Sequence, residues 1–316
     1  MRTLVLMFFT LVLAACGNYS NDDLEFLEAL PGRQDLQAQV PQDQASALAL
    51  KAWLYSDTVA AAMQIDEGVE AIIDAIDLIR DRTPSGRTAD ARTWGPFADS
   101  DPRFEDQVVI ARSAQTFNFA FSQRPVGQSE FVKVLSGTFV GASAAKGHGS
   151  LDYEVAPLEE IGHAPADPNL RSLRFVYAND AAPRTVHTTL LSRNPDNGQV
   201  ATLSYVFTES AGEGNLDYDL QGQSDAGPYD VRVLSRWLPD GGAGRADGVG
   251  SLQEHPGWLL EVHQCWDARF LETYYDSQAG LAYADGGFIF GSAPSVGCDA
   301  LLGLPCPRGE PSACPF

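Results

Sequence analysis

The sequence predicts a mainly β protein with α-helices near its N-terminus, built as a large curved antiparallel meander sheet or half-barrel with the helices packed on one face. Three observations predict this class. Helical spacing of apolar residues is confined to the first hundred residues, apolar residues alternate with polar ones from about residue 105 onward, and turn motifs separate the alternating runs. Strands joined by short turns pair as antiparallel neighbours, which makes a meander the expected topology.

The composition supports a folded and strongly acidic protein. Hydrophobic residues make up 44% of the 316 residues and charged residues only 20%, so the chain can bury a core and is not expected to be disordered overall. The formal net charge is −21. Nucleic-acid binding requires clustered lysine and arginine, so a nucleic-acid partner is excluded.

The N-terminus has the pattern of an export signal. Arg2 precedes an apolar run, residues 4–12, that is too short to span a bilayer. The run ends in Leu13-Ala14-Ala15-Cys16, which resembles the lipobox of bacterial lipoprotein precursors. The resemblance implies that residues 1–15 are a signal peptide, that cleavage precedes Cys16, and that Cys16 becomes diacylated on sulfur and acylated on its new amine. Several acyl chains anchor a protein durably in a membrane. The alternative is an ordinary secretory signal in which the cysteine is coincidental.

The lipoprotein resemblance also sets the expected location, the bacterial cell envelope. Gly17 follows the cysteine, and in enteric bacteria a residue other than aspartate there favours the outer membrane. Residues 16–42 are polar and acidic, with Pro31-Gly32 and Pro41 as breakers, so we expect a lipidated flexible tether with one helical turn in residues 24–30.

Residues 43–100 are expected to form a helical segment that packs on the sheet. Two helices are predicted, the first over residues 43–63. The second has apolar residues at helical spacing: Ile65, Val69, Ile72, Ile73, Ile76 and Ile79. Its polar face is acidic, whereas helices that lie on membranes are usually basic there, so packing on the protein's own sheet is preferred over a membrane or partner.

Residues 101–277 are predicted to form the antiparallel β domain, with eleven or twelve strands. Alternation is clear at residues 117–121, 151–155, 203–207, 216–220 and 231–233, and residues 131–140 and 258–266 are further strands. Turns are predicted at residues 195–198, 211–214 and 240–242, and a short helix at residues 157–161.

The cysteines predict two disulfides. Four cysteines remain after lipidation of Cys16, namely Cys265, Cys298, Cys306 and Cys314. An even number in an exported chain indicates disulfides, with three connectivities open. We favour Cys298–Cys306 and Cys265–Cys314, which would staple a C-terminal tail, residues 278–316, to the sheet.

The motifs that could carry chemistry are incomplete. His255, His263 and Cys265 form the nearest zinc-like cluster, but structural zinc requires four tightly spaced ligands. Residues 143–146 match the SxxK spacing without the companion motifs, and residues 293–297 resemble a nucleophile elbow with no histidine downstream. The glycine-rich loop at residues 240–248 offers two carboxylates to calcium, which takes six to eight oxygen ligands. A solvated turn in which Arg245 pairs with a carboxylate is preferred, and no catalytic, metal or cofactor residue is expected.

Three functions follow from these observations. The first is a lipid-anchored envelope protein without catalysis, a binding or structural module whose partner is a ligand or another envelope protein. The second is a carrier of a lipophilic ligand, since the predicted sheet with N-terminal helices resembles, at fold level only, the half-barrel lipoprotein carriers of the LolB type. That function requires an apolar cavity under the helices. The third is an envelope hydrolase, which would require carboxylates such as Asp152, Asp217 or Asp219 to converge in a cleft.

Overall fold

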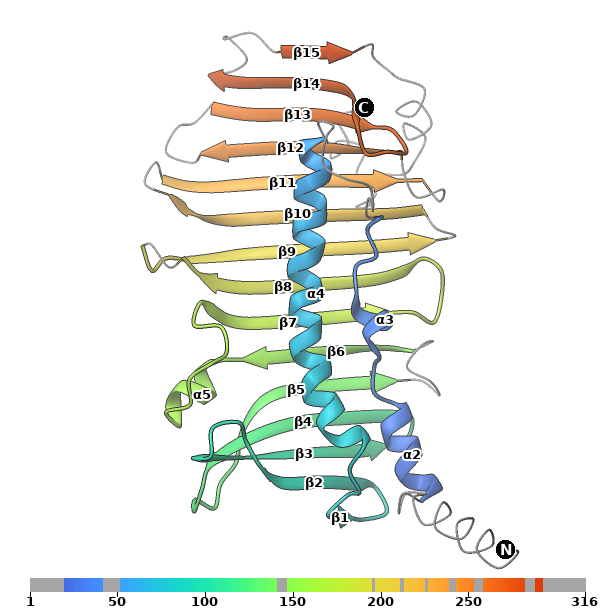
Figure 1. Ribbon diagram of the computed structural model, residues 1–316, viewed down its shortest axis with the longest axis vertical. Coiled ribbons are helices and arrows are strands. Elements are labelled where there is room, and N and C mark those ends of the chain that lie inside the picture. Colours follow the sequence, from blue (N-terminus) through green and yellow to red (C-terminus); the bar gives the residue numbers. More distant parts are fainter. Residues whose placement is uncertain are drawn as a thin grey trace, which may run out of the picture.

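A single antiparallel sheet dominates the computed structural model. The structure describes residues 20–41, 52–140, 147–194, 197–210, 213–224, 227–238, 243–252, 258–281 and 288–291. In these ranges the sheet has fifteen strands, and their order in space is their order in the sequence, from β1 to β15 (Figure 1). The predicted fold class, an antiparallel meander with helices on one face, is therefore confirmed.

The longest of the described strands are β9, β10 and β11, with 11, 12 and 11 residues. Their bounds are β1 Gly86–Arg87, β2 Ala91–Ala98, β3 Phe104–Ser113, β4 Thr116–Pro125, β5 Val132–Val140, β6 His148–Glu154, β7 Leu170–Ala178, β8 Arg184–Arg193, β9 Val200–Ser210, β10 Glu213–Ser224, β11 Gly227–Trp237, β12 Gly244–Leu252, β13 Trp258–Trp266, β14 Glu272–Leu281 and β15 Phe288–Gly291. The short helix α5, Ala156–Glu160, follows β6, as the sequence predicts.

The alternating runs become strands because alternate side chains reach opposite faces of a sheet. On β4, Phe117 and Phe119 are buried and Asn118 between them is exposed. The runs predicted at residues 131–140 and 258–266 are β5 and β13. Twelve of the fifteen strands, β3 to β14, begin within residues 101–277, so the predicted eleven or twelve strands of the β domain are confirmed. The predicted turns fall largely on residues 195–196, 211–212 and 239–242, which lie outside the described residues.

One long helix, α4, lies across the strands. It runs from Trp53 to Arg80 without interruption, so the prediction of two helices is wrong here. The reason is that no proline separates the two stretches and the apolar spacing continues through both. Ile65, Val69 and Ile76 are buried against aromatic side chains of the sheet such as Phe175. At 1.5 Å per residue, its 28 residues span about 42 Å.

The N-terminal end of α4 is fixed to β11, β13 and the turn after β13. The backbone N–H of Leu54 donates to Oε1 of Gln264 at 2.7 Å, and the ring of Tyr55 stacks on Phe270 with centroids 4.4 Å apart. The hydroxyls of Thr58 and Ser235 lie 2.5 Å apart. Because these contacts are buried, they hold the helix in a defined position over the sheet.

Residues 20–41 pack on the sheet beside α4, so the predicted tether is wrong for this stretch. They contain α2, Asn21–Glu28, and α3, Arg33–Leu36 (Figure 1). Phe26 is fully buried and meets Phe117 edge to face, with ring centroids 5.5 Å apart. Asp23 accepts a hydrogen bond from Nε of Arg92 at 2.5 Å. The segment is acidic overall, but its few apolar residues, such as Phe26, Leu30 and Leu36, are buried in the main core.

The sheet also begins earlier and ends later than predicted. β1 and β2 lie inside the expected helical segment, residues 43–100, and β14 and β15 extend past residue 277. β2 was missed because its alternation is broken by a bulge between Trp94 and Phe97. Gly95 in that bulge has φ of 103°, a conformation that favours glycine.

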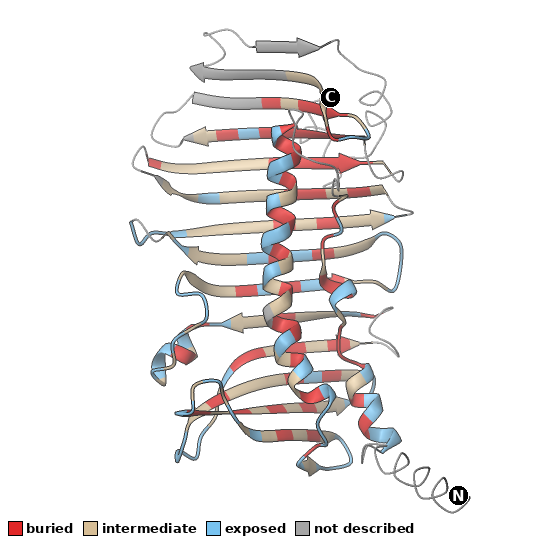
Figure 2. Cartoon of the chain, viewed as in Figure 1, coloured by how far each residue is buried: buried red, intermediate tan, exposed pale blue. Residues whose placement is uncertain are grey.

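The two faces of the sheet differ. The face under α4 holds the main core, and buried residues lie along the helix and beneath it (Figure 2). On the other face of β7 and β8, Arg174, Val176, His187 and Thr189 are exposed. At β7 and β8 the meander is thus covered on one face, the face under α4.

Candidate functional site

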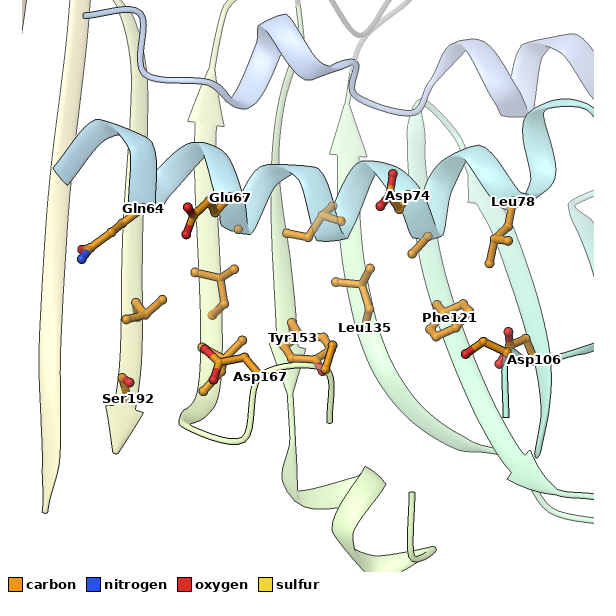
Figure 3. Close-up of a pocket in the computed structure, with 18 of the residues that line it drawn as sticks. Gln64, Glu67, Asp74, Leu78, Asp106, Phe121, Leu135, Tyr153, Asp167 and Ser192 are labelled. Atoms are coloured by element: carbon orange, nitrogen blue, oxygen red, sulfur yellow. The ribbon is translucent and has the colours of Figure 1, made fainter. Parts of the chain in front are cut away.

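A cavity of about 720 Å³ lies between α4 and the sheet. α4 forms one wall through Gln64, Glu67, Gly68, Ile72, Asp74, Ala75 and Leu78 (Figure 3). The opposite wall consists of side chains on β4 to β9, namely Phe121, Leu135, Tyr153, Leu170, Leu173, Leu190 and Leu203. Ligand pockets in proteins typically occupy about 300–1,000 Å³ and are mostly apolar, so the size and lining of this cavity fit a binding site.

The cavity exists because one helix is narrower than the strands it covers. A helix is about 10–12 Å across, whereas a ten-residue strand such as β4 is about 33 Å long. The chain that contains α2 and α3 covers the sheet on one side of α4 (Figure 1). On the other side, the loop after α5 contributes Ala166 and Asp167 to the rim, and the space between remains open.

Small residues on α4 keep this space from being filled. Gly68 and Ala75 both face the cavity. A Cβ atom on Gly68 would lie 2.8 Å from Cδ2 of Leu173, so the glycine permits close approach of helix and sheet at this point. Ala75 is too short to reach the opposite wall, which leaves room beside it.

A pair of carboxyl groups lies at the β3 end of the cavity. Nε2 of Gln123 donates to Oδ2 of Asp99 at 2.6 Å and to Oδ1 of Asp106 at 2.8 Å. Asp99 is in the connection between β2 and β3, and Asp106 is on β3 opposite the bulge of β2. Both residues line the cavity, and Figure 3 shows Asp106 beside Phe121 and below Leu78.

The two carboxyl groups have different pKa values. Burial, together with the nearby charge of Asp99, raises the pKa of Asp106 to about 6, although the hydrogen bond from Gln123 opposes this. Burial also acts to raise the pKa of Asp99, but donors from the Asp101 backbone and the Ser100 hydroxyl outweigh it and lower that pKa. Near neutral pH the pair therefore places negative charge at the end of the cavity.

His163 completes this end of the site. Its Nε2 lies 3.5 Å from Oδ1 of Asp99, and its ring packs edge to face on Phe104 with centroids 4.4 Å apart. The His163 side chain is 15% exposed. His163 does not line the cavity, so its imidazole lies beside Asp99 on the side away from the cavity lining.

The carboxylates singled out in the sequence do not form one site. Asp152 is on β6, where it pairs with Arg174, and its Oδ1 lies 3.4 Å from the arginine Nε. Asp217 and Asp219 are on β10 beside Arg232. Four strand spacings separate β6 from β10, which is about 19 Å. These three residues therefore do not converge in a cleft, as an envelope hydrolase built on them would require, and each has an arginine partner.

Asp106 and Asp99 were missed, although the sequence contains a signal for Asp106. On β3, Phe104, Asp106, Val108 and Ile110 alternate toward the core, so an aspartate occupies an apolar position. A carboxylate in such a position needs a functional or structural reason, because burying a charge is costly. Nothing in the linear sequence indicates that Gln123 bridges it to Asp99.

His263 from the zinc-like cluster and Asp247 from the glycine-rich loop belong to an ionic cluster on the other face of the sheet. Asp247 accepts a hydrogen bond from Nε of Arg245 at 3.1 Å and lies 3.0 Å from Nδ1 of His263. Arg236 also contacts Asp247, with 3.4 Å between Nη2 of the arginine and Oδ2 of the aspartate. The expected pairing of Arg245 with a carboxylate is confirmed, but the expected solvated turn is wrong for residues 244–248, which lie on β12 with Arg245 and Asp247 buried. Within the described ranges, no group of three or more histidine, cysteine or acidic side chains could hold a metal ion.

Several predicted residues lie outside the described ones. They include Cys16 with its lipobox, three of the four disulfide cysteines (Cys298, Cys306 and Cys314), His255, and residues 143–146 and 293–297. Cys265 is described and lies buried on β13. Lipidation and the disulfide pairings therefore stay predictions.

Comparisons with known proteins found no match among family models, curated proteins or solved structures. In the part of the chain that the structure describes, no helix has both the length and the apolarity needed to cross a membrane. The class of protein is therefore described by its fold and site alone: one antiparallel sheet, with a largely apolar cavity between the sheet and one long helix.

Proposed function

We propose that this protein is a lipid-anchored protein of the bacterial cell envelope that binds an elongated apolar ligand in the cavity under α4. The observation that carries the proposal is the cavity itself, which has a volume of about 720 Å³, with aliphatic and aromatic side chains lining most of the sheet wall and Ile72, Ala75 and Leu78 on the α4 wall. A purely structural module would gain stability by filling this space, because empty volume costs packing energy. Of the expected functions, the cavity favours the carrier of a lipophilic ligand.

The proposal includes no reaction. Among the residues that the structure describes around the cavity, Ser100 donates its hydroxyl to Oδ1 of Asp99 at 3.0 Å, as a nucleophile would to a base. The pKa of Asp99 is lowered, however, and a general base works best when its pKa is near the working pH. Asp99 is therefore too weak a base to activate this hydroxyl at neutral pH.

Ligand binding can be tested by closing the cavity. Ala75→Phe places an aromatic ring in the cavity, whereas Ala60→Phe makes the same change at an exposed position of the same helix. Both variants would carry Cys16→Ser, so that the protein's own acyl chains do not compete. The probe is N-phenyl-1-naphthylamine, a neutral dye that fluoresces in apolar sites. We expect Ala75→Phe to weaken its binding at least tenfold and Ala60→Phe to leave it unchanged.

Two results would contradict the binding function. One is saturable dye binding that is equal in both variants, and the other is the absence of binding in the parent protein. Thermal melts of both variants establish that each is folded. If Ala75→Phe does not fold, Leu78→Ala tests the same cavity, because it enlarges the lining without adding bulk and should bind the dye as well as the parent or better.

The lipid anchor is a separate part of the proposal and rests on the lipobox at residues 13–16. A palmitate analogue should label the protein made in a bacterial host, and Cys16→Ala should abolish the label. Detergent phase partitioning should follow the same pattern, and fractionation should recover the labelled protein with the outer membrane. Equal labelling of both forms would contradict the anchor without affecting the cavity.

Two disulfides, Cys298–Cys306 and Cys265–Cys314, belong to the same proposal. An exported protein is expected to oxidise an even set of cysteines, and Cys265 lies buried on β13, where a pairing would fix the chain that follows the sheet. Peptide mapping without reduction should recover these two pairs. Recovery of either other connectivity would reject the pairing.

A further inference from the structure

We propose that the cavity selects amphiphiles with a cationic amine head group, which would pair with Asp106 and Asp99, and that it rejects anionic amphiphiles such as fatty acids. This inference rests on the proposed function, since it names the class of ligand for the same cavity. Three features of the site carry it, namely the sign of the charges on its walls, the partners of its buried carboxylate, and the position of that carboxylate relative to the apolar surface.

Every charged side chain that lines the cavity is a carboxylate. Among the described residues that form its walls, the charged ones are Glu67, Asp74, Asp99, Asp106 and Asp167, and none is lysine or arginine. Figure 3 shows Glu67 and Asp74 on α4, and Asp106 and Asp167 on the opposite side of the cavity. A carboxylate ligand would meet like charges in a region of low dielectric, where repulsion is much stronger than in water.

Asp106 differs from three of the other four buried aspartates, which pair with arginine; the fourth, Asp35, accepts from the backbone N–H of Gly32 and does not line the cavity. Asp23 pairs with Arg92, Asp217 with Arg232, and Asp247 with Arg245. Asp106 is only 6% exposed and has no arginine or lysine partner among the described residues, although it faces the cavity. A buried carboxylate is normally paired with a cation, because leaving it unpaired costs several kcal/mol. Among the described residues, His163 lies beside Asp99 but outside the cavity lining, so a bound amine would supply the permanent cation that this lining lacks.

The carboxyl pair lies at one end of an elongated apolar surface. Asp99 and Asp106 border the cavity at β3, next to Phe121 on β4, and the lining continues to Leu203 on β9. Six strand spacings separate β3 from β9, which is about 29 Å. An amphiphile can therefore place its head group at the carboxyl pair while its chain lies along the leucine side chains of β5 to β9.

Three ligands with the same chain separate the contributions of charge and apolar contact. Dodecylamine, dodecanol and dodecanoate have twelve carbons each and differ in the head group. The assay is displacement of N-phenyl-1-naphthylamine from the Cys16→Ser protein at pH 7.5 in 150 mM salt. Each ligand is used at concentrations too low for it to form micelles or to aggregate. We expect dodecylamine to bind at least tenfold more tightly than dodecanol, and dodecanoate at least tenfold more weakly, with one ligand per chain.

Two variants locate the preference. Asp106→Asn removes the charge while retaining the shape of the side chain, and it should reduce the preference for amine over alcohol at least fivefold. Asp152→Asn removes one carboxylate from the opposite face of the sheet, so it controls for the general attraction of an acidic protein to amines and should leave the preference unchanged.

The outcomes distinguish this inference from the proposed function. If the dye and dodecanol bind but dodecylamine shows no advantage, the charge selection is wrong and the apolar binding function stands. If the parent protein binds neither the dye nor any of the three ligands, the proposed function itself fails. A preference that survives Asp106→Asn would overturn the assignment of the head group to this end of the cavity, and the selectivity of the parent protein tests the inference even if that variant does not fold.

Discussion

Asp106 occupies a position that the strand pattern of β3 would assign to an apolar side chain. Its neighbours toward the core are Phe104 and Val108, and its contacts are Gln123 and the carboxyl group of Asp99, which itself faces His163. Because this position holds an aspartate in place of an apolar residue, the cavity has a polar group at its β3 end. The same residue should dominate the pH dependence of stability in this region.

Asp106→Asn should stabilise the protein at pH 8 and have no effect below about pH 4. The pKa of Asp106 is raised from 3.8 to about 6 in the folded protein, so the folded state holds this proton over a range in which the unfolded chain has released it. The free energy of unfolding therefore falls as the pH rises from about 4 to 6, by up to about 3 kcal/mol, and asparagine removes that loss. Urea unfolding at several pH values measures it.

The matched control for the Asp106 prediction is Asp152→Asn. Asp152 is paired with Arg174 on the open face of the sheet, so its replacement should show no gain in stability that grows between pH 4 and 6. An Asp106→Asn protein that is less stable than the parent at pH 8 would contradict the prediction. It would mean that the charged form is stabilised in the folded state.

At the scale of elements, α4 performs two tasks with different sides of the helix. One side fills the core, as Ile76 does, and another borders the cavity, as Leu78 does. The two positions are two residues apart on the same helix, so they have similar local propensities and differ in what they touch. Their substitution by alanine separates packing from cavity lining.

Ile76→Ala should lower the free energy of unfolding by about 2–5 kcal/mol, because it creates a new void in a packed site. Leu78→Ala should cost clearly less, since part of its side chain already faces empty space. Denaturant unfolding of the two variants measures the difference. Equal losses would indicate that the cavity is filled by neighbouring side chains in solution.

The sequence predicted the elements where a regular period was present. The spacing of the isoleucines in α4 and the alternation on β4 and β9 gave both element type and buried face, because these patterns depend only on local geometry. The prediction from sequence failed where a segment has too few apolar residues to show a helical or alternating period. Residues 20–41 pack through Phe26, Leu36 and a buried ion pair between Asp23 and Arg92, and such long-range partners leave no periodic trace in an acidic segment.

The site was less predictable than the fold. The sequence led to the expectation of an apolar cavity only through a fold-level resemblance, and it selected carboxylates by their occurrence on strands rather than by their positions in space. Asp99 and Asp106 come together through the bulge in β2 and through Gln123 on the next strand. Neither a bulge nor a bridging side chain can be inferred from residue spacing alone.

At the scale of the whole molecule, charge repulsion acts on the sheet. The formal net charge is −21, and many of the arginines are used in local pairs such as Arg124–Glu105 and Arg184–Glu209, leaving a surplus of carboxylates. A large net charge destabilises a compact state through self-repulsion, and salt screens it. The protein should therefore be more stable at physiological salt than at low salt.

Raising NaCl from 20 to 200 mM at pH 7.5 should raise Tm by a few degrees, which is on the order of a 1 kcal/mol gain for a domain of moderate size. The same shift with KCl would identify screening rather than binding of a particular ion. A fall in Tm would mean that the ion pairs contribute more to stability than the repulsion removes. Calorimetry in both salts provides the measurement.

The length of α4 sets a limit on how this architecture can change in evolution. The helix is held at one end by Gln264 and Ser235, and at the other by the indole of Trp94, which donates to the carbonyl of Arg82 at 2.7 Å. Its 42 Å corresponds to about nine strand spacings. An added hairpin between these attachments would widen the sheet by about 10 Å, and the helix would have to grow by about six residues to match. Insertions in homologues should therefore occur in pairs, one hairpin with nearly two helical turns.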